Sequence, residues 1–248
     1  MLNRFDRGTM DANLQGKTAL ISGGTGGLGR AVTLAFLDAG AHAAVTYRKR
    51  EELTALQHEA GARTSHITPY SIDVTDDASV RAAVEDIVLL QGRIDILVNT
   101  VGAYAGGIKL WDVQPKVFSR MLDLNLRSGY ILARNVVPVM LKQESGAIVN
   151  IAAKAAFDHA AGASAYAASK AAAVAMIDCL AEDLRGTGVR VNSVLPSIID
   201  TEANRQAMPS ADFSKWPKPE EIARVILFLC ADDALLIHGA AIPVYGNG

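Results

Sequence analysis

A tyrosine and a lysine stand four residues apart, at Tyr166 and Lys170, within an alanine-rich stretch that has a helical pattern. Residues four apart share one face of a helix, so the two side chains are expected to lie together. A free phenol has a pKa of about 10 and is a poor acid at neutral pH, whereas a neighbouring cation favours the phenolate and lowers that pKa. The pair therefore predicts a proton donor whose phenol pKa is depressed by the lysine.

A second chemical signal is the turn Ser22–Gly29, which reads Ser-Gly-Gly-Thr-Gly-Gly-Leu-Gly and follows a short apolar run. Glycines let backbone amides come close to a pyrophosphate, and the start of the following helix adds partial positive charge. Glycine content alone is weak evidence, because many turns are rich in glycine. The position of this turn between a strand and a helix is what predicts a dinucleotide site.

The next strand ends in Tyr47-Arg48-Lys49-Arg50, without an acidic residue at its tip. NAD sites usually place an acid there for the ribose hydroxyls, whereas NADP sites bring an arginine to the 2′-phosphate. Arg48 has the geometry for a bidentate pair with a phosphate. The sequence therefore favours NADP(H) and leaves NAD(H) possible; the alternative for Arg48 is a solvated basic turn that opens a helix.

These residues need elements to position them, and the chain supplies apolar runs that alternate with longer helical patterns. Strands are expected at Thr18–Ser22, Ala43–Tyr47, His66–Ile72, Ile94–Asn99, Ala147–Ala152, Val189–Leu195 and Ala241–Tyr245. Helices are expected at Gly29–Ala39, Arg50–Glu59, Asp76–Gln91, Pro115–Gln143, Ala165–Arg185 and Glu220–Ala231. This alternation predicts an α/β fold, a doubly wound parallel sheet with helices on both faces and ligands at the carboxyl ends of its strands.

Composition excludes several classes of protein. The 248 residues are 50% apolar and carry a net charge of −2, which argues against disorder and against a basic nucleic-acid surface. We expect a single domain over residues 1–248, with a polar N-terminal arm at 1–14 and a lid at 200–219. No membrane-spanning run, signal peptide or metal-ligand spacing of histidines is apparent, and two cysteines indicate no disulfide framework. The expected location is the cytoplasm, with no membrane or nucleic-acid partner.

Further motifs occur in order and spacing along the chain: Ser22–Gly29, Asp73-Val74, Asn99–Gly102, Asn125, Tyr166 with Lys170, and Pro196 with Thr201. Together they resemble the short-chain dehydrogenase/reductase family from about Lys17 to the C-terminus. The resemblance implies a Rossmann-type sheet of about seven strands in a three-layer αβα arrangement, hydride transfer with a nicotinamide, and a homodimer or homotetramer. The expected subunit face is formed by the helices at 115–143 and 165–185.

The resemblance also implies roles for single residues. Tyr166 would be the general acid/base, Lys170 would hold the nicotinamide ribose and favour ionisation of Tyr166, and Asn125 would anchor the water of a proton relay. Asp73 would contact the adenine, Asn99 and Gly102 would border the adenosine, and Thr201 would meet the carboxamide. The expected cofactor contacts are Gly23, Thr25, Gly27, Leu28, Gly29, Arg48, Asp73, Val74, Asn99, Gly102, Tyr166, Lys170, Pro196 and Thr201.

One position departs from the family pattern. A serine usually stands thirteen residues before the tyrosine and donates a hydrogen bond to the substrate carbonyl, and here that position is Ala153. The loss of one such donor typically lowers the rate by ~10²–10³. Ser164 and Ser197 are candidate substitutes, although a helix N-cap and a turn are their alternative roles.

Two segments resemble the dihydropteridine reductases, a branch of the same family that also lacks this serine. They are Ala153-Lys154-Ala155-Ala156 with Asp158, and the stretch from Leu195 to Trp216. In that branch the second strand is followed by an acid, which this chain lacks. The sequence therefore predicts an oxidoreductase for a conjugated carbonyl or imine-type small molecule that resembles a pterin or a quinone, with Ala153, Tyr104 and Trp216 as candidate substrate contacts. Two alternatives stay open: a dinucleotide-binding sensor or scaffold with little turnover, and an ordinary carbonyl or alcohol oxidoreductase with a substitute hydroxyl.

Overall fold

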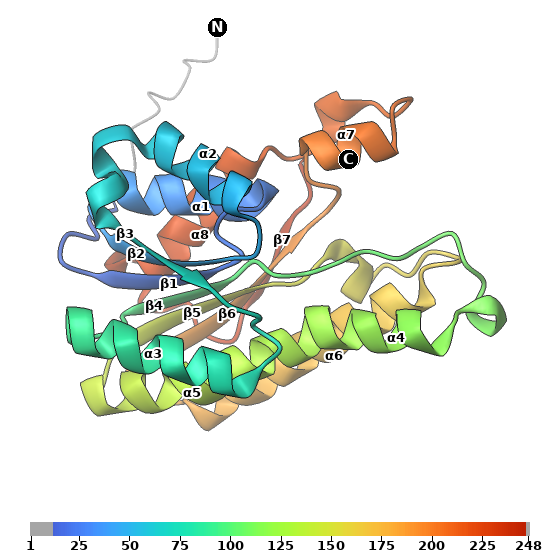
Figure 1. Cartoon of the computed structure of the whole chain (residues 1–248). Coiled ribbons are helices and arrows are strands. Elements are labelled where there is room, and N and C mark those ends of the chain that lie inside the picture. Colours follow the sequence, from blue (N-terminus) through green and yellow to red (C-terminus); the bar gives the residue numbers. More distant parts are fainter. Residues whose placement is uncertain (1–11, 247–248) are drawn as a thin grey trace, which may run out of the picture.

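A computed structural model describes residues 12–246, and its centre is a seven-stranded parallel sheet (Figure 1). The spatial order of the strands is β3-β2-β1-β4-β5-β6-β7. Their bounds are β1 Thr18–Ser22, β2 His42–Tyr47, β3 Ile67–Ser71, β4 Ile96–Asn99, β5 Gly146–Ile151, β6 Val189–Pro196 and β7 Ala241–Val244. The order reverses between β1 and β4, which is the point where doubly wound sheets bind ligands.

Helices cover both faces of the sheet and complete the three layers (Figure 1). One face carries α1 Gly27–Asp38, α2 Arg50–Ala60 and α8 Pro219–Cys230. The other carries α3 Asp77–Gln91, α4 Pro115–Leu122, α5 Ser128–Gln143 and α6 Ser164–Asp183. A separate hydrophobic cluster fills each interface, and the strands β1, β4 and β6 are buried along their whole length. Apolar residues dominate β1 and β4 because a parallel sheet buries both of its faces. In β6 the buried side chains of Arg190 and Asn192 donate hydrogen bonds to the carbonyls of Leu229 and Ile237.

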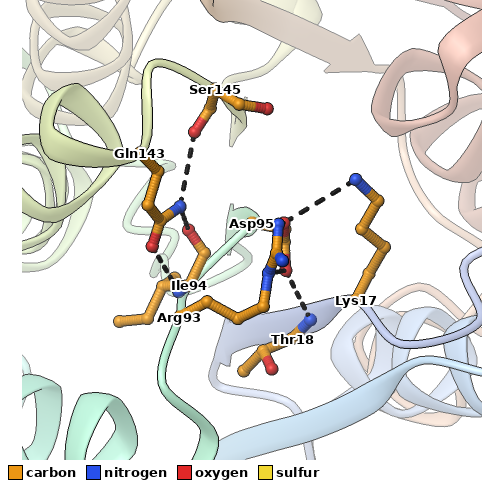
Figure 2. A network of polar contacts seen from close by, with 7 residues as sticks. All are labelled: Lys17, Thr18, Arg93, Ile94, Asp95, Gln143 and Ser145. Atoms are coloured by element: carbon orange, nitrogen blue, oxygen red, sulfur yellow. Dashed lines mark hydrogen bonds and ion pairs between the residues drawn. The ribbon is translucent and has the colours of Figure 1, made fainter.

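The edge of the sheet at the amino ends of β1 and β4 is closed by a polar network (Figure 2). The buried carboxylate of Asp95 accepts hydrogen bonds from the Thr18 amide at 2.9 Å and from Nε of Arg93 at 2.8 Å. Gln143, at the end of α5, hydrogen-bonds to the amide and the carbonyl of Ile94. These hydrogen bonds fix the positions of β1 and α5 relative to the start of β4. The opposite edge of the sheet, at the carboxyl ends of the strands, remains for ligands.

The structure adds detail to the expected helices and loops. Helical backbone runs over all of Pro115–Gln143 as expected, but Asp123–Arg127 in its middle is a wider π-type turn, where the side chain of Asn125 is anchored to Ala103 in a separate loop. The segment 200–219 is not wholly irregular, since it contains α7 Glu202–Ala207, capped by the Thr201 hydroxyl. Ser164 is not an N-cap: it is the first residue of α6, and Ala163 occupies the cap position.

The expected arm at residues 1–14 divides into two parts. Residues 1–11 lie outside the described residues. Leu14 belongs to the core, since its side chain is 2% exposed and its amide donates to the carbonyl of Ala39 at 2.8 Å. Within residues 12–246, no helix is long and apolar enough to cross a membrane.

Candidate active site

The glycine turn between β1 and α1 forms the first part of the site. Helix α1 begins after Gly26, which has no side chain to cap it, and its first turn contains no acid. Two residues outside the turn fix its position. The Gly23 amide donates to Oγ1 of Thr46 at 2.9 Å, and Oγ1 of Thr100 donates to the carbonyl of Ser22 at 2.6 Å. An uncapped helix start in a fixed turn suits a pyrophosphate.

Close backbone contacts explain why this turn requires glycine. A Cβ on Gly29 would lie 2.0 Å from the carbonyl oxygen of Gly23, and a Cβ on Gly24 would lie 2.7 Å from Cγ1 of Val45. A Cβ on Gly27 would meet Cγ2 of Thr201 at 2.9 Å. The start of the 200–219 segment therefore lies against the glycine turn, which brings Thr201 to the expected cofactor site.

Other expected cofactor residues cluster at the ends of neighbouring strands. Arg48 follows β2 and Asp73 follows β3, and both side chains are exposed or partly exposed. Hydrogen bonds from Thr75 lower the pKa of Asp73, and the charge of Arg48 lowers it further. Thr25 is buried and its hydroxyl donates to Glu52 at 3.1 Å. The carboxylate of Glu52 therefore lies beside the glycine turn, a contact that the sequence pattern does not predict.

Asn99 is buried at the end of β4, and its side chain binds protein groups. Its Oδ1 accepts from Oγ of Ser22 at 2.6 Å, and its Nδ2 donates to Oδ1 of Asn150 at 3.0 Å. These residues are register partners on β1, β4 and β5, so the amide of Asn99 cross-links the sheet below the expected adenosine site.

Tyr166 and Lys170 lie in the first two turns of α6, one face of which is directed toward the carboxyl end of β5. Lys170 is 5% exposed, and its Nζ donates to the carbonyl of Ile151 at 2.8 Å. Burial lowers the pKa of Lys170 to about 8. The expectation of a depressed phenol pKa was wrong for the protein alone, because burial, and then Tyr104, raise the pKa of Tyr166 to about 12.

Asn125 joins this pair through a compact polar cluster. Its Oδ1 accepts from the Ala103 amide at 2.8 Å, and its Nδ2 donates to Oγ of Ser169 at 2.9 Å. A Cβ on Gly102 would lie 3.0 Å from Oδ1 of Asn125 and 3.2 Å from Nζ of Lys170. Asn125 and Lys170 therefore meet beside Gly102, and Ser169 joins them to Tyr166, because its Oγ donates to the Tyr166 carbonyl at 2.7 Å. Ser169 was missed, although its spacing of three from Tyr166 puts it on the same helical face.

The position of the missing serine is occupied by the methyl group of Ala153, which is 7% exposed directly after β5. Neither serine considered as a substitute offers a free hydroxyl at the surface. Oγ of Ser164 is buried without a partner among the described residues, and Oγ of Ser197 donates to the carbonyl of Tyr245 at 2.8 Å.

The candidate substrate residues do not all lie together. The ring of Tyr104 lies edge-on against Tyr166, with centroids 5.0 Å apart. Trp216 packs instead against Phe213 and lines a cavity of about 450 Å³ together with Asp200 and Arg205. Lys154 is held between Asp158, 3.7 Å away, and the ring of Tyr245.

The fold and the site together define a dinucleotide-binding oxidoreductase. A glycine turn lies at the topological switch point after β1, and Tyr166, Lys170 and Asn125 lie near the carboxyl ends of β4 and β5. The sequence profile of the short chain dehydrogenase family matches residues 17–212. The chain therefore belongs to the short-chain dehydrogenase/reductase family and is an NAD(P)-dependent enzyme.

Relatives within the family have different substrates. The chain is 34% identical to a 3-oxoacyl-(acyl-carrier-protein) reductase of Thermotoga maritima over 94% of this chain and 98% of that protein. It is also 34% identical to the D-threitol dehydrogenase of Mycolicibacterium smegmatis, over 96% and 94% of the two chains. The solved structure of ElxO with NADP bound superposes with a TM-score of 0.87 at 28% identity, over 93% of this chain and 97% of ElxO.

Proposed function

We propose that this enzyme is an NADP(H)-dependent oxidoreductase that transfers hydride to a small conjugated carbonyl or imine-type substrate resembling a pterin or a quinone. The observation that carries the proposal is the assembly of Tyr166, Lys170 and Asn125 beside Ala153, where the family serine is absent. A conjugated electrophile is already polarised, so it depends less on a second hydrogen-bond donor than an isolated ketone does.

In the proposed mechanism, Tyr166 is the proton donor. Its raised pKa keeps the phenol protonated at neutral pH, so that it can donate to the substrate heteroatom. When bound, the reduced nicotinamide would supply the hydride, which carries both electrons, to one end of the conjugated double-bond system of the substrate, and Tyr166 would supply the proton to the oxygen or nitrogen at its other end. Lys170 would bind the ribose hydroxyls, and Asn125 would anchor the water that returns a proton to Tyr166.

The preference for NADP(H) rests on the end of β2. The residues Tyr47-Arg48 offer a cation and no carboxylate to a 2′-phosphate, and ElxO, a structural relative, binds NADP. The glycine turn fits the pyrophosphate of this cofactor, because glycine is required there by backbone contacts and the helix start is uncapped. Further proposed contacts come from Gly102, Pro196 and Thr201.

Substrate would approach from the side of Tyr104, and Ala153 would lie against it. Trp216 is the third proposed substrate contact, as part of a lid at 200–219 that lies against the glycine turn. The proposed assembly is a homodimer or homotetramer formed through α4, α5 and α6, on which the side chains of Phe118, Tyr130 and Leu141 are exposed. A monomeric mass by light scattering would contradict this assembly.

A different function, a dinucleotide-binding sensor or scaffold with little turnover, is favoured only by Ala153. The polar cluster around Asn125 argues against it, since a protein that merely binds a dinucleotide has no chemical need to bring Tyr166, Lys170 and Asn125 together.

Turnover of quinonoid dihydropterin, quinones and simple ketones, with NADPH and with NADH, tests the proposal. Wild-type protein should oxidise NADPH with the conjugated compounds in preference to the ketones. Tyr166→Phe should lower kcat by about 1,000-fold while the Kd for NADPH stays within about threefold, since only proton donation is removed.

Tyr70→Phe is the matched control, because it removes a phenol that hydrogen-bonds to Asp86 beside the far strand β3. It should retain activity. Tight NADPH binding with no turnover of any compound, and no change on Tyr166→Phe, would instead indicate the sensor or scaffold.

A further inference from the structure

The active site lacks the hydroxyl that Ala153 cannot provide, and the two serines considered as substitutes do not replace it. Oγ of Ser164 is enclosed at the start of α6, and Oγ of Ser197 is already bonded to the carbonyl of Tyr245. A substitute hydroxyl would therefore come from another element and reach the proton donor Tyr166.

Tyr104 meets these requirements. It lies in the loop that follows β4, its side chain is 69% exposed, and its ring centroid is 5.0 Å from that of Tyr166 at an interplanar angle of 76°. Charge repulsion between the two phenols, a smaller effect than burial, also raises the pKa of Tyr166. An exposed phenol that touches the proton donor has both a face and a hydroxyl available to a bound substrate.

Gly106, two residues further along the loop, determines where the Tyr104 ring can lie. Gly106 does not adopt a positive φ, so backbone conformation does not require glycine there. A Cβ on Gly106 would, however, lie 2.0 Å from the hydroxyl oxygen and 2.4 Å from Cζ of Tyr104. The absence of a side chain at Gly106 therefore makes the room in which the phenol rests against Tyr166.

We propose that Tyr104, seated over Gly106, donates a hydrogen bond to the substrate oxygen or nitrogen that Tyr166 protonates, and so replaces the donor missing at Ala153. This inference rests on the proposed function and adds a substrate-binding residue to it. Tyr104 transfers no atom in the reaction: the proton comes from Tyr166, and the Tyr104 hydroxyl stabilises the charge that develops on the heteroatom.

The test uses full-length protein, NADPH and 9,10-phenanthrenequinone, a flat conjugated dicarbonyl. Tyr104→Phe should lower kcat by about 30-fold, less than the ~10²–10³ typical for the loss of one donor to a developing oxyanion, because a conjugated substrate is already polarised. The Kd for NADPH should not change. Tyr104→Leu, which also removes the ring, should in addition raise KM. Tyr70→Phe on β3, away from the site and from the proposed subunit face, is the control and should match wild type.

Rescue separates a donor from a packing residue. Ala153→Ser alone should change kcat by less than about threefold, but in the Tyr104→Phe background it should restore at least about tenfold, because the new serine supplies the missing hydrogen bond. Gly106→Ala should reproduce the kcat loss of Tyr104→Phe with the protein folded, since the atom that must move is the end of a side chain.

Each result bears on a different claim. Quinone turnover by wild type with equal kcat in Tyr104→Phe would overturn this inference and leave the proposed function intact. Loss of kcat in Tyr104→Phe without rescue by Ala153→Ser would assign Tyr104 to packing and also overturn it. Failure of wild type to reduce the quinone or any other conjugated compound would contradict the proposed function, and the inference with it.

Discussion

The two halves of the active site are built in different ways. In the cofactor half, eight consecutive residues from Ser22 to Gly29 form the turn, in which a Cβ on Gly29 would meet the Gly23 backbone and a Cβ on Gly24 would meet the side chains of Val45 and Thr33. In the substrate half, three separated loops after β4, β5 and β6 contribute exposed side chains such as Tyr104, Phe157 and Ile198. The first half leaves almost no freedom to its residues, whereas the second tolerates replacement of side chains on a fixed frame.

This difference explains how one family accommodates many substrates. The relatives at 34% identity are, by their names, a 3-oxoacyl-(acyl-carrier-protein) reductase and a D-threitol dehydrogenase. Loops carried on a fixed frame can change their side chains without altering the fold. Ala153 belongs to the substrate half and lies two residues after the end of β5.

The largest expected effect comes from replacing Gly29 in the cofactor half, because an added Cβ there would meet backbone and not a side chain that can move. Gly29→Ala puts a Cβ 2.0 Å from the carbonyl of Gly23, so the turn must shift, and a shift of about 1 Å can cost about 100-fold. We expect at least that loss in NADPH affinity by isothermal titration calorimetry. Gly24→Ala meets side chains of Val45 and Thr33 instead and should lose less. Equal affinity in Gly29→Ala and wild type would show that the turn is not the cofactor site.

The Arg48→Ala variant tests whether one side chain in the cofactor half pairs specifically with the 2′-phosphate of NADPH. Loss of a charge-assisted bidentate pair costs about 1.5–3 kcal/mol, so Arg48→Ala should weaken NADPH binding by roughly 10- to 100-fold and NADH binding by less than about threefold.

Arg50→Ala is the matched control for Arg48. Arg50 lies two residues further along the basic turn, and its Nη1 donates to the Tyr47 hydroxyl. Equal losses of NADPH affinity in the two variants, both reduced by salt, would indicate a diffuse basic turn instead of a phosphate pair.

Most of the frame could be predicted from the sequence, because most strands of the sheet are short, largely apolar runs bounded by turns. All seven expected strands occur, with ends displaced by at most two residues. The π-type turn Asp123–Arg127 could not be predicted, since the apolar pattern of a helix continues across one extra residue. Its anchor is the pair of hydrogen bonds between the Asn125 side chain and the backbone of Ala103, which lies 22 residues earlier.

Residue types in the site were easier to predict than their electrostatics. The sequence brings Tyr166, Ser169 and Lys170 to one helical face, but it cannot tell how deeply that face is buried. Burial reverses the expected shift of the Tyr166 pKa, and the ammonium of Lys170 is directed to the Ile151 carbonyl. The side-chain amide of Asn99 is bonded to Ser22 and Asn150, which the sequence does not reveal, and the place of this residue beside the adenosine stays a prediction.

The smallest predicted effect concerns the buried lysine that the two halves share. The pKa of Lys170 is about 8 in the folded protein and 10.5 ordinarily. Between these pH values the unfolded chain holds a proton that the folded chain lacks, so the free energy of unfolding rises with pH through this window. From pH 7 to pH 9.5 the contribution of Lys170 should increase by about 2 kcal/mol, since one pKa unit corresponds to ~1.4 kcal/mol.

Urea denaturation of wild type and Lys170→Met at both pH values measures this contribution by difference. Other buried groups, such as the Cys230 thiol with its raised pKa, cancel because both proteins contain them. Stability of wild type relative to Lys170→Met should therefore be greater at pH 9.5 than at pH 7, whereas Lys116→Met, at an exposed position of α4, should show no such difference. A pH-independent difference between wild type and Lys170→Met would mean that water reaches Lys170, and that the frame is looser at this point than its contact with Ile151 implies.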